Sequence, residues 1–322
     1  MKFIIDESAN GKTVLTYLKS IVKISSGTIS HLKTLPDGIC VNGSRVTVRY
    51  ILSTGDILSI NSDDTDNQNE HIAPVNLPVE TVYEDDNIIV VNKPTNMPTH
   101  PSHNHHYDTL GNAIAYLYST RNAPFVFRPT GRLDRNTSGL VMLPKSRAAA
   151  SFFSAESKSG RIEKHYIAVL EGEISAEYGK VYSIEAPIKR CGDSIITRKV
   201  STPDDPDADY ALTNWRLIYS GSGISIVDAY PITGRTHQIR VHFASIGYPL
   251  VGDSFYGDTR YGFDCHLLHA VSLKFKKCFS EEYLHVSATP SDVMAHFVLK
   301  KTGCELEEIT KNYDFSIPLS PE

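Results

Sequence analysis

The sequence has few cysteines and lacks any apolar run long enough to cross a membrane. Its five cysteines are Cys40, Cys191, Cys265, Cys278 and Cys304. Their odd number, wide spacing and lack of a C-x-x-C pair argue against a disulfide framework or a zinc site. No apolar run approaches the ~20 residues of a membrane span. Acidic residues at positions 6 and 7 come too early for a secretory signal. We therefore expect a soluble, cytoplasmic protein.

An excess of positive charge is also missing. The chain has 32 Lys and Arg residues against 37 Asp and Glu, a net charge of -5. This balance weighs against nucleic-acid binding, which draws on clustered cations. The distribution matters more than the total, because residues 1–60 carry seven basic and four acidic residues, a net charge of +3. No dinucleotide-binding or P-loop motif is present, so no nucleotide cofactor is indicated.

The first 61 residues predict a small domain of helices and hairpins. Apolar residues recur at helical spacing from Lys12 to Lys23, and a shorter helix is expected from Thr28 to Leu35. Asn42-Gly43 lies between short apolar segments, which is a strong hairpin signal. This order resembles the small RNA-binding domain named after the fourth small-subunit ribosomal protein, here called S-four-like. The alternative is a cap without a ligand. Residues 62–78 are polar and predict a flexible acidic linker.

A second domain is expected over residues 79–300, followed by a tail over residues 301–322. Its centre is the segment 131–145, which reads GRLDRNTSGLVMLPK. The apolar part from Leu140 to Leu143 predicts a buried strand. The part before it packs two arginines around Asp134 with small, turn-forming residues, which predicts a loop at a functional site. A nearby arginine would favour the charged form of this carboxyl group.

This segment resembles the motif H-R-L-D-x-x-T-S-G-L of the RluA family of pseudouridine synthases, except that Gly131 stands at the histidine position. The resemblance implies that Asp134 is the catalytic aspartate. It also implies that Arg132 enters the RNA stack when the target uridine is flipped out. The alternative is a structural Asp–Arg pair in a turn.

Two further segments carry the same resemblance. The run KHYIAVL over residues 164–170 predicts a strand, and the family places a tyrosine, here Tyr166, against the target base. A phenol can stack on a base and can take part in proton transfer at carbon five. The run GRTHQIR over residues 234–240 predicts a strand-to-helix corner from which Arg235 projects. The resemblance implies that Arg235 pairs with Asp134; the alternative is a phosphate contact.

A third segment, LHAVSLKF over residues 268–275, resembles the last motif of the family, and Leu268 is expected in the apolar wall of the uridine pocket. Four histidines between residues 100 and 106 invite a metal hypothesis. We reject that hypothesis, because no second ligand cluster lies at a known spacing. A closing helix is expected from Ser291 to Lys300, and the chain from Thr310 onward is expected to be loose.

The resemblance implies an α+β protein with the pseudouridine synthase fold, a mixed and largely antiparallel sheet with flanking helices and a central cleft. It implies an isomerase that converts uridines of structured RNA without a cofactor. We expect the substrate to be large-subunit ribosomal RNA, with transfer RNA as the other candidate, and we expect the protein to be a monomer. The first alternative is an RNA-binding assembly factor that has lost catalysis. The second is a glycoside hydrolase, which would need another carboxylate beside Asp134.

Overall fold

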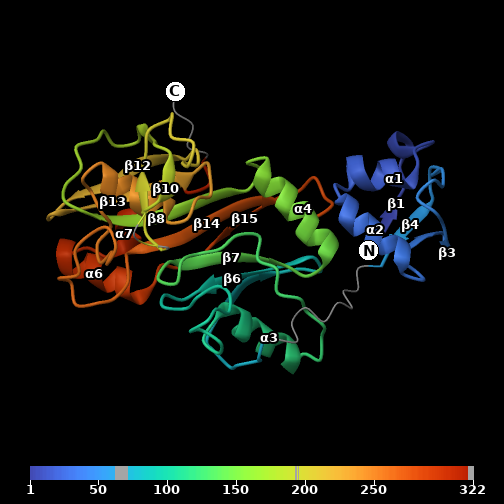
Figure 1. The fold of residues 1–322 in the computed structure, drawn as a ribbon, viewed down its shortest axis with the longest axis horizontal. Coiled ribbons are helices and arrows are strands. Elements are labelled where there is room, and N and C mark those ends of the chain that lie inside the picture. The colour runs from blue at the N-terminus through green and yellow to red at the C-terminus, as the bar shows by residue number, and fades with distance from the viewer. Residues whose placement is uncertain (62–71, 193, 195, 318–322) are drawn as a thin grey trace.

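The computed structural model describes residues 1–61, 72–192, 194 and 196–317. A small N-terminal unit lies at one end of a large sheet-based unit (Figure 1). The fold is α+β, as the sequence predicts. Residues 62–71 of the expected linker lie outside the described residues. Its last part packs on the larger unit, since Val75 donates its amide N–H to the Asn112 carbonyl at 3.2 Å. Among the described helices, none is long and apolar enough to cross a bilayer.

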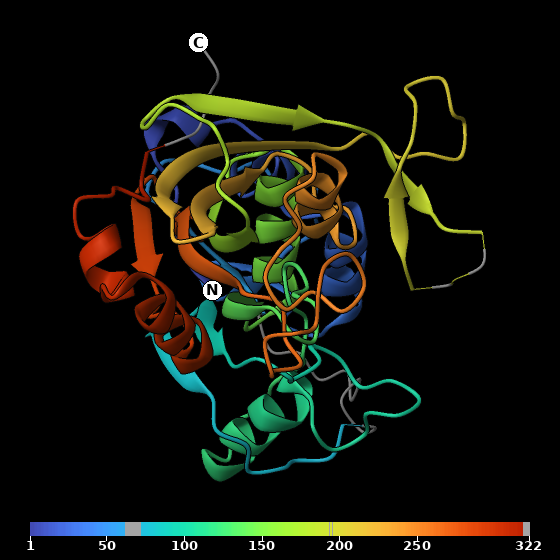
Figure 2. The ribbon, with the colours of Figure 1, turned by 90° about the vertical axis from the view of Figure 1, so that its left-hand side faces the viewer.

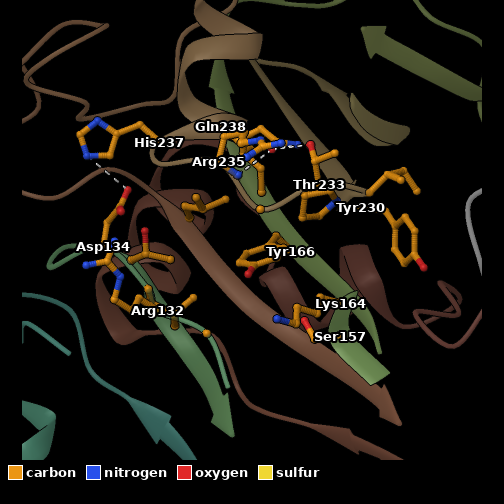
Figure 3. Close-up of a pocket in the computed structure, with 18 of the residues that line it drawn as sticks. Arg132, Asp134, Ser157, Lys164, Tyr166, Tyr230, Thr233, Arg235, His237 and Gln238 are labelled. Atoms are coloured by element: carbon orange, nitrogen blue, oxygen red, sulfur yellow. Dashed lines mark hydrogen bonds and ion pairs between the residues drawn. The ribbon is translucent and has the colours of Figure 1, made fainter. Parts of the chain in front are cut away.

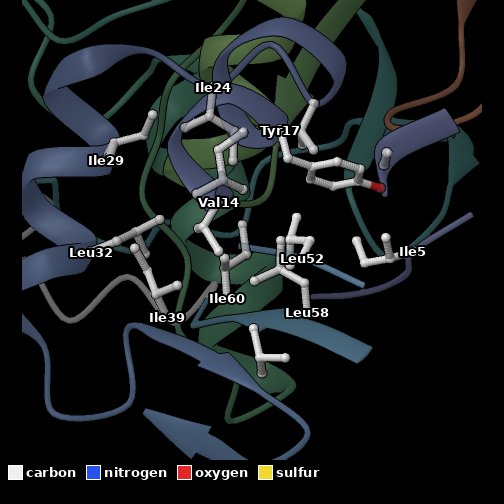
Figure 4. Packing of buried hydrophobic residues seen from close by; sticks show 14 of the residues in the cluster. Ile5, Val14, Tyr17, Ile24, Ile29, Leu32, Ile39, Leu52, Leu58 and Ile60 are labelled. Carbon is white, nitrogen blue, oxygen red and sulfur yellow. The ribbon is translucent and has the colours of Figure 1, made fainter. Parts of the chain in front are cut away.

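The N-terminal unit pairs a short helical segment with a four-stranded antiparallel sheet. The strands are β1 (Lys2–Ile4), β2 (Ile39–Val41), β3 (Ser44–Arg45) and β4 (Ile57–Ile60), in the order β1-β4-β2-β3. The helical elements are η1 (Glu7–Ala9), α1 (Val14–Thr16), η2 (Tyr17–Ile21) and α2 (Ser26–Thr34). The predicted first helix is therefore present, but its second half is wound with wider turns. Its apolar face packs on the sheet around Val14, Leu52 and Leu58 (Figure 4).

This unit is docked on the larger one. Its core includes Ala148 from helix α4 (Arg147–Lys158) and contacts Phe279. The Phe279 ring meets the Phe3 ring edge-on, with the two centroids 5.4 Å apart. The amide N–H of Ser25 also donates to the Ser151 hydroxyl at 2.8 Å. The two units therefore share apolar contacts as well as the connecting chain.

The larger unit is built on a nine-stranded sheet. Its strands are β5 (Glu80–Glu84), β6 (Ile88–Lys93), β7 (Ser138–Pro144), β8 (Glu163–Glu171), β9 (Val181–Glu185), β12 (Leu212–Gly221), β13 (Ile224–Pro231), β14 (Leu268–Lys276) and β15 (Tyr283–Ser287). The order is β5-β6-β7-β14-β8-β13-β12-β9, with β15 beside β14. Only β7 and β14 pair in parallel among these described strands. The predicted mixed, largely antiparallel sheet is confirmed.

Helices cover both faces of this sheet. In the part of the sheet formed by β6 and β7, α3 (Leu110–Thr120) packs on one face and α4 packs on the opposite face. Alternate residues of β6 point to the two faces and contact one helix each. On the other part, α5 (Gln238–Ser245) covers one face, while α6 (Asp292–Thr302) and α7 (Leu306–Thr310) cover the opposite face. All seven residues of β7 are buried, as its unbroken apolar run predicts.

A small hairpin stands apart from the large sheet. It consists of β10 (Ile188–Arg190) and β11 (Arg198–Val200), paired antiparallel. Figure 2 shows this yellow hairpin projecting from the side of the larger unit. The predicted polar segment between residues 188 and 209 therefore contains two strands that the sequence analysis did not identify.

The end of the described chain is held in place, which corrects the expectation of a loose segment from Thr310 onward. The Tyr313 hydroxyl donates to the buried carboxylate of Asp228 at 2.9 Å. The carbonyl of Phe315 accepts a hydrogen bond from the Ser272 hydroxyl at 3.3 Å. Residues up to 317 thus close over the face of the sheet that α6 and α7 cover. Residues 318–322 lie outside the described residues.

Gly139 allows β7 and β14 to approach each other where they run in parallel. Its φ is +111°, and an added Cβ would lie 2.3 Å from the Ala270 carbonyl oxygen. We expect Gly139→Ala to lower the free energy of unfolding by at least about 2 kcal/mol, because strain and overpacking add. Urea unfolding would measure this loss. Gly179→Ala is the control, since Gly179 has φ +81° with open space around it. Equal losses in both variants would contradict the role of close packing.

Candidate active site

A cavity of about 330 Å³ opens between the end of α4 and the start of α5, over strands β8 and β14. Its size is at the lower end of the range for small-ligand sites. All five residues that the sequence analysis singled out line this cavity, namely Arg132, Asp134, Tyr166, Arg235 and Leu268. Figure 3 shows the first four of them around it. Four segments far apart in the sequence therefore meet at one place.

The loop that carries Asp134 is held by buried polar groups beneath it. The Lys93 ammonium group, which is fully buried, donates to the carbonyls of Pro94, Met97 and Arg135 at 2.8–3.2 Å. The Thr99 hydroxyl donates to the carbonyl of Leu133 at 2.9 Å. These bonds hold the backbone on both sides of Asp134, so the direction of its side chain is set by the core.

The two residues that follow the loop are tied to β14 and the chain before it. Thr137 Oγ1 lies 2.7 Å from His266 Nε2, and Ser138 Oγ lies 2.8 Å from His269 Nδ1. Burial lowers the pKa of His266 to about 3 and that of His269 to about 4, so both rings are neutral at pH 7. The T-S-G part of the motif is therefore structural, since it fixes β7 to β14.

Arg240 is the arginine that contacts Asp134. Its Nη1 donates to Asp134 Oδ2 at 3.1 Å. Its other nitrogens form a bidentate pair with Asp253, with Nε–Oδ2 at 2.7 Å and Nη2–Oδ1 at 2.8 Å. Arg240 and Asp253 are almost completely buried, whereas Asp134 is 28% exposed at the cavity. Burial lowers the pKa of Arg240, but the two carboxylates outweigh it and raise the pKa overall.

The predicted pair between Arg235 and Asp134 is absent among the described contacts. Arg235 instead donates from Nε to the Tyr210 carbonyl at 2.9 Å, and its Nη1 lies 3.4 Å from Asp209. The physical reason is the position of α5, which begins at Gln238, after the exposed Arg235. Helical side chains tilt toward the N-terminus of their helix, so Arg240 reaches the loop. Arg240 belongs to the same GRTHQIR motif as Arg235.

His237 is a further residue that the sequence analysis did not assign. It precedes α5 in a left-handed conformation, with φ of 58°. Its Nε2 lies 3.7 Å from Asp134 Oδ2 (Figure 3), and its Nδ1 lies 2.9 Å from the Tyr256 hydroxyl. Burial lowers the pKa of His237. The His237 ring therefore lies at the edge of the cavity, between Asp134 and Tyr256.

Tyr166 projects from β8 into the cavity, across from Asp134 (Figure 3). Burial and the nearby Asp134 charge raise the pKa of its phenol, which is therefore protonated at neutral pH. Lys164 precedes it on the same face of the strand, and burial lowers the pKa of its ammonium group. Gly131 leaves room for this group, because an added Cβ would lie 3.2 Å from Lys164 Nζ.

The other two predicted residues differ in exposure. Arg132 is exposed where it lines the cavity, so its guanidinium can reach a molecule outside. Leu268 is 5% exposed and lies at the start of β14, where it forms an apolar part of the wall. Within the part of the chain that the structure describes, Asp134 is the one carboxylate that lines the cavity.

Comparisons with known proteins identify the family of this chain. Residues 87–245 match the family model described as RNA pseudouridylate synthase. The chain is 33% identical over 271 residues to the uncharacterized RNA pseudouridine synthase YjbO of Bacillus subtilis (strain 168), covering 84% of this chain and 93% of that protein. It is 28% identical over 299 residues to ribosomal large subunit pseudouridine synthase C of Vibrio cholerae, covering 88% of this chain and 91% of the relative.

A similar structure has been solved for a human protein, RNA pseudouridylate synthase domain containing 1. The TM-score is 0.58 at 26% sequence identity, and the match covers 76% of this chain and 97% of the human one. The segments that match the family model include both the loop of Asp134 and the start of α5.

Proposed function

We infer the reaction from the family, because this chain belongs to the RluA family of RNA pseudouridine synthases. Enzymes of this family are isomerases that act on RNA. The reaction breaks the bond between the ribose C1′ and N1 of uracil and forms a bond from C1′ to C5. The proton of C5 is lost and N1 gains one, so the atoms balance without a redox partner. We propose that Asp134 carries this reaction.

The position of Asp134 in the cavity is the main support for its catalytic role. A single carboxylate, Asp134, lines the described cavity, accepts a hydrogen bond from the buried Arg240 and faces the phenol of Tyr166. Charge-assisted bonds of this kind favour the charged carboxylate and fix its direction. A glycoside hydrolase would need a second carboxylate on the opposite side of the sugar. The described cavity wall offers none, which favours the isomerase over the hydrolase.

The carboxylate of Asp134 is proposed to act on the ribose, as a nucleophile at C1′ or as a base. In both cases the detached uracil must turn over and rejoin through C5 before it escapes. This step requires that water, which would intercept the sugar, is kept from the site while the base turns over. Arg240 would hold the carboxylate through the reaction, because the bonds from its Nε and Nη2 to the buried Asp253 fix the position of the guanidinium group.

Tyr166 is proposed to contact the base with its ring and to donate from its hydroxyl. Because its pKa is raised, the phenol is protonated before the reaction begins. It can accept a proton only after it has lost its own. Leu268 would provide the apolar surface around the base. Flipping a nucleotide costs a few kcal/mol of stacking, and the exposed Arg132 is placed to fill the vacated space.

The proposed substrate is large-subunit ribosomal RNA, the RNA named for the Vibrio cholerae relative. The N-terminal unit, residues 1–61, is proposed to act as an S-four-like RNA-binding domain. Its helical segment packed on a small antiparallel sheet supports this proposal. We further propose that the enzyme works in the cytoplasm, as a monomer and without a cofactor.

The experiment is to incubate the purified protein with ribosomal and transfer RNA transcribed in vitro, and to map pseudouridines by chemical labelling and sequencing. Transcribed RNA is used because it contains no sites that are already modified. We expect new pseudouridine at one or a few positions of large-subunit ribosomal RNA. New sites confined to transfer RNA would contradict the proposed substrate. The absence of new sites in any RNA would contradict the proposed reaction and favour the assembly-factor alternative.

A further inference from the structure

A second groove, of about 750 Å³, continues from the cavity of Asp134. The two share Gly234 and Arg235, so the Arg235 side chain lies on the ridge between them. The groove is lined mostly by the hairpin of β10 and β11 and by the loop that follows it. Its cationic residues are Lys189, Arg190, Arg198, Lys199 and Arg235, against the acidic Asp207 and Asp209. Positive charge is thus concentrated here on a chain with a net charge of -5.

The hairpin places like charges directly opposite each other. Lys189 pairs with Lys199, and Arg190 pairs with Arg198 across the two strands. Like charges in opposite positions destabilise a strand pair. The outer part of the hairpin projects from the larger unit (Figure 2), whereas Ile188 and Val200 at its base pack near Val241 of α5. A polyanion bound along this surface would relieve the repulsion.

An acidic loop of the same chain offsets part of this charge. Over residues 203–209, the loop reads PDDPDAD. Asp205 bonds to the Lys189 ammonium, which lowers the pKa of Asp205 to about 2. Asp209 lies 3.4 Å from Arg235, and both side chains are largely exposed, at 69% and 39%. The contact between Asp209 and Arg235 is therefore long and open to solvent, and such pairs contribute little.

The backbone of Asp209 is held independently of its side chain. Its amide N–H donates to the Ile188 carbonyl at 2.9 Å, and its carbonyl accepts from the Ile188 N–H at 2.8 Å. A rotation of the Asp209 side chain would therefore release Arg235 without moving the loop. Arg235 keeps its position through the bond from Nε to the Tyr210 carbonyl. The Nη1 and Nη2 atoms of Arg235 would then be available to another hydrogen-bond acceptor.

We propose that a phosphodiester of the substrate RNA replaces Asp209 on Arg235, and that the groove beside the hairpin takes the adjoining RNA backbone. The inference rests on the proposed function, since a nucleotide in the cavity has its phosphates at the rim where Arg235 lies. Guanidinium groups bind phosphate oxygens through two parallel hydrogen bonds, which a single long contact to a carboxylate does not match. Asp209 thereby acts as an internal competitor that weakens binding of other polyanions.

The test measures binding of a fluorescein-labelled RNA hairpin with a uridine-rich loop, by anisotropy, over a range of KCl concentrations. Arg235→Gln should weaken binding about tenfold at low salt and reduce the slope of log affinity against log salt by about one, because one phosphate contact is lost. Asp209→Asn should tighten binding about threefold in the parent protein, but should have no effect in the Arg235→Gln background. The matched control is Arg260→Gln, an exposed arginine paired with Asp258 away from both cavities.

Parent-like affinity and salt slope in Arg235→Gln would overturn the inference. So would an equal effect of Asp209→Asn in both backgrounds, or an equal loss in the Arg260→Gln control. A fall in turnover at saturating RNA as large as that of an Asp134 variant would instead place Arg235 in the chemistry and overturn it as well. These failures differ from failure of the proposed function, which is seen when the parent protein itself forms no pseudouridine.

Discussion

Replacing Asp134 by asparagine is expected to reduce pseudouridine formation by about 10⁴-fold or more, the scale seen when a residue at the reacting atoms is lost. An amide cannot act as a nucleophile or base toward the ribose, although it has nearly the same shape. Arg240 would still find an oxygen at this position, so RNA binding should change by less than about threefold. Single-turnover assays on transcribed RNA, with binding measured in parallel, would separate these two effects.

Asp258→Asn makes the same chemical change on an exposed loop and serves as the control. It should retain the turnover of the parent protein. Substantial pseudouridine formation by Asp134→Asn would contradict the role of the carboxylate. Loss of both turnover and binding would mean that the asparagine disturbs the loop held by Lys93, and circular dichroism would detect a wider loss of structure.

Replacing Arg240 by glutamine is expected to reduce both turnover and stability. The change removes the N–H donor to Asp134, and loss of one such donor at a reacting group costs about 10²–10³-fold in turnover. It also leaves the buried Asp253 without its cation. Breaking a buried pair in this way costs about 3–5 kcal/mol of stability. Urea unfolding and single-turnover rates would measure the two losses.

A double variant separates the two roles of Arg240. Combining Arg240→Gln with Asp253→Asn removes both buried charges. The side-chain oxygen that remains after Asp253→Asn can still accept the backbone N–H groups of Phe255 and Tyr256, which Asp253 binds in the parent protein. Stability should recover by most of the loss, because no unpaired charge remains. Turnover should stay low, because Asp134 still lacks its partner. Recovery of turnover along with stability would restrict Arg240 to a structural role.

The sequence was sufficient for the parts of the fold that depend on local pattern. The apolar run from Leu140 to Leu143 predicted a buried strand and the segment 164–170 predicted a further strand, and both are present as β7 and β8. The segment GRTHQIR over residues 234–240 predicted a strand-to-helix corner, and α5 begins within it at Gln238. Motif resemblance also predicted that Asp134, Tyr166 and Leu268 belong to one site, and they line one cavity.

The partner of Asp134 could not be read from the sequence, because two arginines lie five residues apart in one motif. The choice depends on where α5 begins and on Asp253, which binds the fork of Arg240 from a third segment. Arg235 was therefore assigned to the wrong contact. Likewise, the short strands β10 and β11 carry charged residues in place of an apolar pattern, so periodicity gave no signal for them.

The parallel pairing of β7 with β14 has a consequence for synthesis of the chain. Ser138 and Gly139 meet His269 and Ala270, about 130 positions later in the sequence, so the pocket cannot close while the polypeptide is still emerging. Contacts between distant segments form late, because a long loop must first be closed. A nascent chain that already contains Asp134 should therefore be catalytically inert until β14 has left the exit tunnel, which stalled nascent chains of increasing length would test.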